Sequence, residues 1–448
     1  MIRKASRSVL FLLFLLLALR SPGAAQDTKL PGDAGDDPLA GQARVDRQAL
    51  VRTVLERNPS LEAARQAWRA AQARVPQARA LADPMLSFGI APLSLLPGSP
   101  PGQTLELRQD LPYPGKRDLR GRMAEAEAEM VLSDYSMARL ELAATAALLF
   151  EDYRLVHRAI EINQDHLRLL EDLREAAAAR YAAGLASQQD PIQAEIEGTG
   201  LLERGIELEA EREGLMARIN ALLHRRPGLP LPPPEADAAD AGGPGPALPS
   251  PEALEEAALA ARPEMAGSLA GLRARQAGID LARRERQPDF GIMGSYNSMW
   301  MGTEHRWMAG VSVSLPVRTA RLAAAEAEAA ARLAQAESDR ARLEIEIRAG
   351  VRERLASLAE ARRRIELYDD RLLPAVRDSI QAARAAFETG QASFLTVIEA
   401  ERALRRAQLG FEQALADRRR REVEIDRALG RLPAGSPPDL PAAQGGAK

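Results

Sequence analysis

Few residues in this 448-residue chain have the types and spacing that catalysis or metal binding requires. Its four histidines are scattered along the sequence: His157, His166, His224 and His305. His157 and His166 are nine residues apart, which places them about 180° from one another on a helix. Cysteine is absent, and no Walker loop, dinucleotide fingerprint or His-Glu-x-x-His zinc motif occurs. We therefore predict that the protein is not an enzyme and uses neither a metal nor another cofactor.

Charge and composition also argue against a nucleic-acid partner. Charged residues make up 27% of the chain, but the net charge is only −3, so no basic footprint is present. Alanine, leucine, glutamate and arginine dominate, whereas aromatic residues make up 4%. This composition predicts long helices rather than a conventional globular core.

The N-terminal residues 1–25 have the layout of a secretory signal peptide. Basic residues precede an apolar run at residues 9–19, and small residues follow up to Ala25. The run has eleven residues, fewer than the roughly 20 of a membrane-spanning helix, and no later stretch approaches that length. We predict cleavage near Gln26, which leaves residues 26–57 as the N-terminal segment of an exported chain. Without cysteine, that chain is not lipidated at its N-terminus.

The remaining sequence contains an internal duplication. Three prolines recur at a constant offset of 204 residues: Pro59, Pro84 and Pro112 match Pro263, Pro288 and Pro316. Further on, residues 181–187 match residues 387–393 at an offset of 206. Solenoid units have roughly 20 to 50 residues, so this period indicates a duplicated half-molecule.

The duplication predicts the domain organisation. The two repeats are residues 58–226 and 252–430, and each has the order helix, two short strands, very long helix, turn, long helix. Residues 227–251, rich in proline, glycine and alanine, form a linker between them. Residues 431–448 are expected to form a flexible C-terminal tail.

Each repeat contains one predicted β-hairpin. The strands are expected at residues 85–95 and 103–111 in the first repeat, and at 289–300 and 307–317 in the second. Each has roughly 9 to 12 residues, the length of a tilted strand that crosses a bilayer, and Trp300 and Trp307 flank the second turn as interfacial aromatics would. A soluble amphipathic hairpin has the same pattern, so both interpretations stay open on the strands alone.

Residues 318–387 are predicted to form a very long helix. Apolar residues, Leu372 among them, recur from Leu343 to Phe387 about every 3.67 residues, above the 3.5 of a left-handed coiled coil. At about 1.5 Å per residue the helix is on the order of 100 Å long, so it must project from any barrel joined to it. Pro374 is expected to kink or interrupt it. A plain antiparallel coiled coil explains the period but not the inserted strand pairs.

The strand count has a consequence for assembly. Four strands with open edges cannot span a membrane, because unpaired backbone groups have no partner in lipid. Copies of the chain would have to pool their strands, and two copies supply eight strands whereas three supply twelve. Three copies would enclose the wider lumen, which favours three if the assembly conducts molecules.

Short motifs in both repeats resemble those of the TolC-like outer-membrane efflux proteins, over nearly the whole exported chain. The first repeat contributes the segment QDLPYPGKR at residues 109–117, the turn at residues 181–190 and the segment INALL at residues 219–223. The second repeat contributes FETG at residues 387–390 and RALG at residues 427–430. Each motif is weak alone, but their order and spacing in both repeats are specific.

The resemblance implies a mainly helical fold with a transmembrane β-barrel. Long antiparallel helical hairpins would form an α-barrel in the periplasm, and four membrane strands per chain would form a trimeric twelve-stranded barrel in outer-membrane lipid. The function implied is that of an outer-membrane channel in a tripartite efflux system of a Gram-negative bacterium. Its partners would be identical copies, a periplasmic adaptor and an inner-membrane pump of the resistance-nodulation-division type. Drugs, small toxic organic compounds or metal ions would be the substrates.

The resemblance also assigns candidate sites at the helical turns. The adaptor-contacting residues would be those of the two turns: Gly184, Leu185, Ala186 and Ser187, with Gly390, Gln391, Ala392 and Ser393. A periplasmic gate would involve Asp190, Thr396 and Glu399, and three copies of Glu399 would favour cations in a narrow mouth. Some family members carry an arginine two residues after the second turn glycine, where this chain has Ala392. An exposed helix position is the alternative for Glu399, and a periplasmic adaptor or coiled-coil spacer without a channel is the alternative for the chain.

Overall fold

The computed structural model describes residues 39, 41–91, 102–235, 248–300 and 302–433. These described residues all belong to one compact unit by their contacts. The predicted signal peptide lies outside the described residues, as do most of the predicted tail and the middle of the linker. In the described part of the chain, no helix combines the length and the apolar character needed to cross a membrane.

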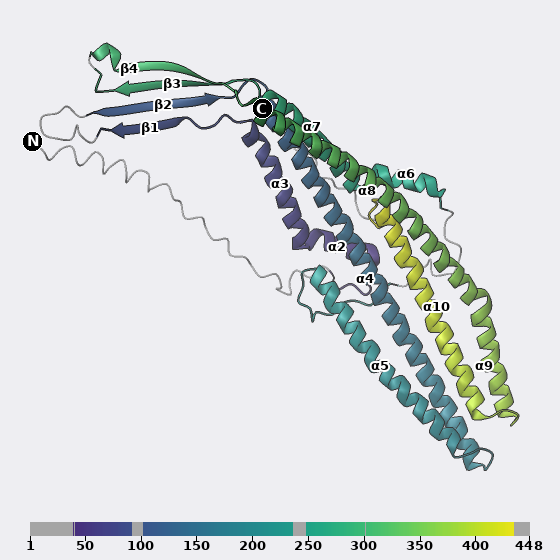
Figure 1. The fold of residues 1–448 in the computed structure, drawn as a ribbon. Coiled ribbons are helices and arrows are strands. Elements are labelled where there is room, and N and C mark those ends of the chain that lie inside the picture. Colours follow the sequence, from purple (N-terminus) through teal and green to yellow (C-terminus); the bar gives the residue numbers. More distant parts are fainter. Residues whose placement is uncertain (1–38, 40, 92–101, 236–247, 301, 434–448) are drawn as a thin grey trace, which may run out of the picture. The chain divides into compact units, whose positions relative to one another are not determined.

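Both repeats have the same order of elements (Figure 1). The first consists of α2 (Arg47–Arg57), α3 (Pro59–Arg79), β1 (Met85–Ile90), β2 (Gln103–Leu111), α4 (Lys116–Ala182) and α5 (Gln189–Leu222). The second consists of α6 (Pro251–Ala261), α7 (Pro263–Arg284), β3 (Asp289–Asn297), β4 (Trp307–Ser314), α8 (Thr319–Leu367), α9 (Leu373–Glu388) and α10 (Phe394–Ala428). A 3-10 helix, η4 (Thr303–His305), precedes β4, and a π-helical turn, η5 (Tyr368–Leu372), joins α8 to α9.

The helix starts of the two repeats recur at the offset of 204 residues. Asp46 caps α2 by accepting hydrogen bonds from backbone N–H groups, and Ser250 caps α6 in the same way. The next helix of each repeat begins with a proline, Pro59 in α3 and Pro263 in α7. Proline is favoured at the first helical position, where its missing N–H has no intrahelical partner to lose. The duplicated pair Pro59 and Pro263 therefore marks a duplicated helix start, whereas Pro84 and Pro288 directly precede β1 and β3.

The four strands form one antiparallel sheet in the order β1-β2-β3-β4. Phe88 pairs with Leu105, Leu105 with Tyr296, and Tyr296 with Trp307, so one row of side chains crosses all four strands. The pairing of β2 with β3 joins the two repeats. Strands β1 and β4 are the two edges, and neither has a further strand beside it among the described residues.

The two faces of this sheet differ in chemistry, because side chains alternate across a strand. One face carries large apolar side chains that are strongly exposed: Phe88 is 62% exposed, Trp307 72% and Val311 75%. The opposite face carries polar and charged side chains, together with Met85, Met293 and Met308: the polar ones are Ser87, Glu106, Arg108, Asp110, Ser295, Ser312 and Ser314. The apolar face thus stays uncovered in a single chain.

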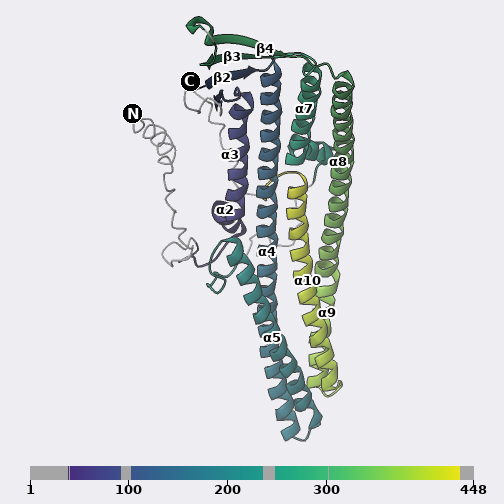
Figure 2. The same cartoon turned by 60° about the vertical axis from the view of Figure 1, so that its left-hand side comes forward.

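The long helices lie side by side in one layer (Figure 2). Near the sheet the order is α3, α4, α7, α8, and further away it is α5, α4, α10, α9. Small side chains allow close packing, as where Gly267 of α7 approaches Ser133 of α4. The buried residues form several separate clusters instead of one central core. This is the arrangement expected of a wall one helix thick.

The predicted long helix is present, and its α-helical course is interrupted just before Pro374. Helix α8 passes through the π-helical turn η5 into α9, and Pro374 lies in the first turn of α9. A π turn has one extra residue per turn, which rotates the following side chains about the axis. Leu373 is consequently buried, whereas Leu372 is 40% exposed. The predicted apolar stripe was wrong at Leu372 because of this local change of period.

The junction between sheet and helices is held by Lys116, at the first residue of α4. Gly115 precedes it with φ of +91°, a conformation that favours glycine. The Lys116 ammonium, 1% exposed, donates to Asp289 Oδ1 of β3 at 2.8 Å and to the Gln287 carbonyl at 3.1 Å. The backbone N–H of Tyr113 also donates to Asp289 Oδ1, at 2.7 Å. The PYPGK motif therefore ties the first repeat to the first strand of the second.

The short helices α2 and α6 are each held by ion pairs to the long helix of their repeat. The short helix carries the positive charge in the first repeat and the negative charge in the second. In the first repeat Arg47 of α2 donates to the buried carboxylate of Glu151 on α4, at 3.2 Å. In the second repeat the buried acid is Glu255 of α6, and the arginines, Arg348 and Arg352, come from α8. Each short helix is therefore fastened to the long helix of its own repeat.

Candidate functional site at the helical turns

The first turn joins α4 to α5 and ends α4 in a Schellman arrangement. The N–H of Leu185 donates to the carbonyl of Arg180 at 2.8 Å, and the N–H of Gly184 donates to the carbonyl of Tyr181 at 2.9 Å. Gly184 has φ of +72°, which is why glycine is favoured there. Ser187 then accepts from the N–H of Gln189 and starts α5.

The second turn, between α9 and α10, repeats this geometry. The N–H of Gln391 donates to the Ala386 carbonyl at 2.8 Å, and Gly390 has φ of +74°. Ser393 is the N-cap of α10, where its Oγ accepts from the N–H of Thr396. The residues predicted for contact with an adaptor therefore form two matching turns, but nothing in a single chain tests that contact.

An arginine side chain connects the two turns. Arg180 Nη1 donates to the carbonyl of Glu388, the last residue of α9, at 3.0 Å. Its guanidinium carbon lies 4.7 Å from the ring centroid of Phe387. The Phe387 ring in turn lies 5.4 Å from that of Phe394, at the start of α10. The end of the first hairpin is thereby attached to the end of the second.

Below the turns, one apolar cluster joins all four helices. It contains Leu170, Leu173 and Ala177 of α4, Ala194 and Leu201 of α5, Ile380, Ala383 and Phe387 of α9, and Phe394, Val397, Ile398 and Ala400 of α10. The cluster buries the inner residues of each helix. It leaves large apolar side chains exposed around the turns, such as Leu185 at 69% and Leu395 at 50%.

The three residues predicted for a gate lie on two different helices. Thr396 and Glu399 are exposed on one face of α10, three residues apart. Asp190 is partly buried in the first turn of α5, and its N–H donates to the Ser187 carbonyl. In the part of the chain that the structure describes, no hydrogen bond or ion pair joins Asp190 to Thr396 or Glu399. The role of all three in a gate stays a prediction.

Two polar contacts between the hairpins were not predicted from the sequence. The buried His166 of α4 lies with Nδ1 2.6 Å from Glu401 Oε1 and Nε2 2.6 Å from Gln408 Oε1, both on α10. Arg402 of α10 binds Glu197 of α5 through both carboxylate oxygens, and this hydrogen bonding holds the pKa of Glu197 below its ordinary value. The partners are 205 to 242 residues apart in sequence, so local spacing gave no signal.

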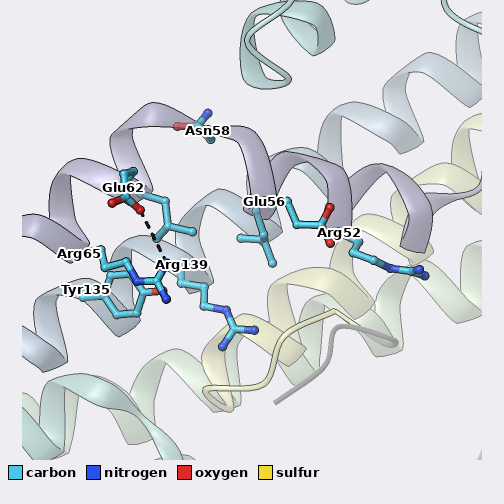
Figure 3. A pocket seen from close by; sticks show the side chains of 9 residues that line it. Arg52, Glu56, Asn58, Glu62, Arg65, Tyr135 and Arg139 are labelled. Atoms are coloured by element: carbon cyan, nitrogen blue, oxygen red, sulfur yellow. Dashed lines mark ion pairs between the residues drawn. The ribbon is translucent and has the colours of Figure 1, made fainter. Parts of the chain in front are cut away.

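A polar hollow of about 310 Å³ lies at the corner between α2 and α3, against α4 (Figure 3). Arg52, Arg65 and Arg139 line it together with Glu56, Glu62, Asn58 and Tyr135. Arg65 and Glu62 form an ion pair at 3.7 Å. The lining contains three arginines and two glutamates, so both signs of charge are present. Across the described residues, no group of three or more His, Cys, Asp or Glu side chains could hold a metal ion.

Comparison with known proteins gives three kinds of match. Residues 254–431 match the family described as outer membrane efflux protein. The cobalt-zinc-cadmium resistance protein CzcC of Cupriavidus metallidurans is 24% identical over 335 residues, which cover 73% of this chain and 77% of CzcC. A solved structure of CusC has a TM-score of 0.75 at 19% identity, over 87% of this chain and 94% of CusC. The open-state MtrE outer membrane channel of Neisseria gonorrhoeae has a TM-score of 0.73 at 18% identity, over 92% and 97% of the two chains.

The structural matches extend over both repeats, whereas the family match covers the second repeat. At identities below a quarter, the likeness to CusC and MtrE shows the fold, which is the mainly helical fold with a small sheet predicted from the sequence. The matches to CzcC and to the efflux protein family are similarities in sequence, in addition to the similarity in fold. The second repeat thus matches the outer membrane efflux protein family, and the chain as a whole has the fold of the CusC and MtrE structures.

Proposed function

We propose that the protein is the outer-membrane channel of a tripartite efflux system, assembled from three copies. The observation that carries this proposal is that a single chain has two open sides, each made of an edge strand and the helices that continue it. Edge strand β1 continues into the side of the wall formed by α3 and α5, and edge strand β4 continues into the side formed by α8 and α9. One side of a copy can therefore join the other side of the next copy along the whole length of the chain.

Joining unlike sides closes a ring when the rotation between copies fits. The strands of one chain alternate in direction, and their number is even, so β4 of one copy would meet β1 of the next in antiparallel pairing. Three copies would give a twelve-stranded barrel without edges, the condition for a sheet in lipid. The same closure would give an α-barrel of helices beneath it.

The two faces of the sheet support this placement. A barrel in the outer membrane needs an apolar outer surface and has a polar interior. The face with Phe88, Trp307 and Val311 would contact lipid, and the face with Glu106 and Arg108 would line the lumen. Burial of that apolar face in lipid would remove the exposed hydrophobic surface seen in a single chain.

At the opposite end, the two turns would meet a periplasmic adaptor, and the adaptor would connect the channel to an inner-membrane pump of the resistance-nodulation-division type. Glu399 would ring the narrow mouth in three copies and favour cations. The name of CzcC specifies resistance to cobalt, zinc and cadmium, so we favour divalent metal cations among the possible substrates. Residues 1–25 would direct export as a cleaved signal peptide, and residues 227–251 would link the repeats.

The alternative of a periplasmic adaptor or spacer has less support. A soluble protein would need another element to cover the apolar face of the sheet, and the described residues contain none. The matches to an outer membrane channel and to an outer membrane efflux family also favour the channel.

Fractionation followed by electrical recording tests the proposal. The protein, expressed in a Gram-negative host with its residues 1–25, should be recovered from the outer membrane. After purification, it should produce discrete conductance steps in planar bilayers. Recovery of the folded protein in the soluble periplasm, without an outer-membrane fraction, would refute the channel.

A further inference from the structure

We propose that the junction between the sheet and the helices binds one anionic phospholipid per chain, with an acyl chain in an apolar hollow of the sheet and the phosphate on Arg117. This inference rests on the proposed channel function, which places the apolar face of the sheet in the membrane. It adds a defined lipid site to that surface. The residues of the site all belong to one chain, so the site does not depend on the joining of copies.

The hollow lies on the apolar face of the sheet and has a volume of about 570 Å³. Leu107, Ile292 and Val311 line it with large side chains, whereas Gly294 and Ala309, which pair across β3 and β4, have small ones. Beyond the chain neighbours of Gly294, no described atom lies within 4 Å of the place that a Cβ would take. Mostly apolar pockets of about 300 to 1,000 Å³ are typical of ligand sites. The occupant expected on a surface that faces lipid is an acyl chain.

A polar side chain, that of Gln109, connects the hollow to the helices. Its Nε2 donates to the Ala82 carbonyl at 2.7 Å and to the Asp110 carbonyl at 3.1 Å, so its amide hydrogens are bound within the protein. Ala82 follows the end of α3. In the last turn of that helix the Arg79 carbonyl accepts a hydrogen bond from Arg117 Nε, at 2.7 Å. The hollow and Arg117 are therefore neighbouring parts of one surface.

Arg117 is oriented but not neutralised. The bond from its Nε to α3 fixes the guanidinium, while no carboxylate and no other acceptor among the described residues binds its two terminal nitrogens. Arg79 beside it differs, because it pairs with Glu125 at 2.8 Å. A planar guanidinium with free N–H groups matches the oxygen atoms of a phosphate. Arg117 is thus placed to bind the phosphate of a lipid headgroup.

The charge around Arg117 also favours an anion. Nine arginines and lysines but only four aspartates and glutamates lie within ten residues of the strands on their helical side, in residues 75–84, 112–121, 279–288 and 315–324. At the other end of the sheet, residues 91–102 contain no charged residue, and residues 298–306 contain one glutamate and one arginine. Basic residues beside an apolar membrane surface attract anionic headgroups. The excess of positive charge therefore indicates a lipid of the periplasmic leaflet.

Binding of phosphatidylglycerol to the purified, delipidated protein tests the proposal by native mass spectrometry. The wild type should prefer it to phosphatidylethanolamine, whose ammonium group weakens attraction to arginine. Arg117→Gln should weaken binding about tenfold, the loss expected for one charge-assisted hydrogen bond, and Arg117→Lys should retain part of the affinity. Arg108→Gln is the matched control, because Arg108 lies on the polar face and pairs with Asp110. Unchanged circular dichroism verifies the fold of each variant.

Gly294→Leu separates a lipid site from general contact with lipid. Leucine fills the hollow and adds apolar surface, so general contact would maintain or raise the binding of phosphatidylglycerol, whereas a site in the hollow requires weaker binding. With a short-chain phosphatidylglycerol, Arg117→Gln should still weaken binding and Gly294→Leu should matter less. Equal binding by the wild type and both variants would overturn the lipid site, even in a protein that conducts. Absence from the outer membrane together with absence of conductance would count against the channel, and the lipid site with it.

Discussion

Replacement of Lys116 by methionine tests how the sheet is joined to the helices. The ammonium of Lys116 is buried and binds both the carboxylate of Asp289 and the carbonyl of Gln287. Methionine fills nearly the same space as the lysine stem, so little cavity is created. The main effect of Lys116→Met should be the loss of the charged partner of Asp289.

The burial of the two partners gives the size of the effect. Removal of one member of a fully buried ion pair costs about 3 to 5 kcal/mol. The Asp289 side chain is 41% exposed, so water can replace part of the lost interaction. It also keeps the hydrogen bond from the Tyr113 N–H. We therefore expect Lys116→Met to lower the free energy of unfolding by about 1 to 3 kcal/mol, the range for one unsatisfied buried group.

The assay is equilibrium unfolding of the detergent-solubilised protein, followed by the circular dichroism of its helices. Arg108→Gln is the control, since Arg108 and Asp110 form an exposed ion pair, and such pairs contribute about 0 to 1 kcal/mol. The double variant of Lys116→Met with Asp289→Asn should cost less than the sum of the two single variants, because neither charge is then left alone. A cost for Lys116→Met no greater than that of Arg108→Gln, or strict additivity in the double variant, would refute the reasoning.

Three further predictions concern the pore, the sheet and the hairpin contact. Glu399→Gln should reduce cation selectivity in planar bilayers, and unchanged selectivity would remove Glu399 from the pore. Deletion of residues 103–111 should abolish insertion into the outer membrane, because β1 and β3 would both lose their pairing with β2 and each copy would present a broken sheet; normal insertion would argue against a closed barrel. The hydrogen bond from Arg402 lowers the pKa of Glu197 below 4.5, so its stabilisation is complete above pH 4.5 and is lost as the pH falls through the lowered pKa. Glu197→Gln should therefore weaken the acid sensitivity of unfolding, measured by pH titration, and an identical acid transition would contradict this.

Local sequence signals predicted most elements of the fold. Proline at helix starts, glycine at positions with positive φ and alternation in the strands each depend on residues next to one another, and a single sequence records them. Pro59, Gly184 and Gly390 are examples. The exposed Leu372 marks the limit of this approach, because a π turn changes the helical period without any residue type that requires it.

The contacts between the repeats were beyond sequence reasoning. The pairing of β2 with β3, the buried His166–Glu401 contact and the bond from Arg180 to Glu388 join residues that are far apart in sequence. Periodicity gives the face of a helix but not the identity of its neighbour. The sequence therefore located the two turns, but not the side chain that connects them.

The ion pairs of α2 and α6 have opposite polarity, and this difference opposes wrong pairing between the two similar repeats. Two similar repeats could exchange their short helices during folding, with α2 on α8 and α6 on α4. Such an exchange would place Arg47 of α2 against the arginines of α8, and Glu255 of α6 against Glu151 of α4. Like charges brought together in partly buried positions are unfavourable, so the wrong pairing is penalised as well as the right one favoured. The opposite polarity of the two pairs therefore directs each short helix to its own repeat, although both short helices have 11 residues and both are followed by a helix that begins with proline.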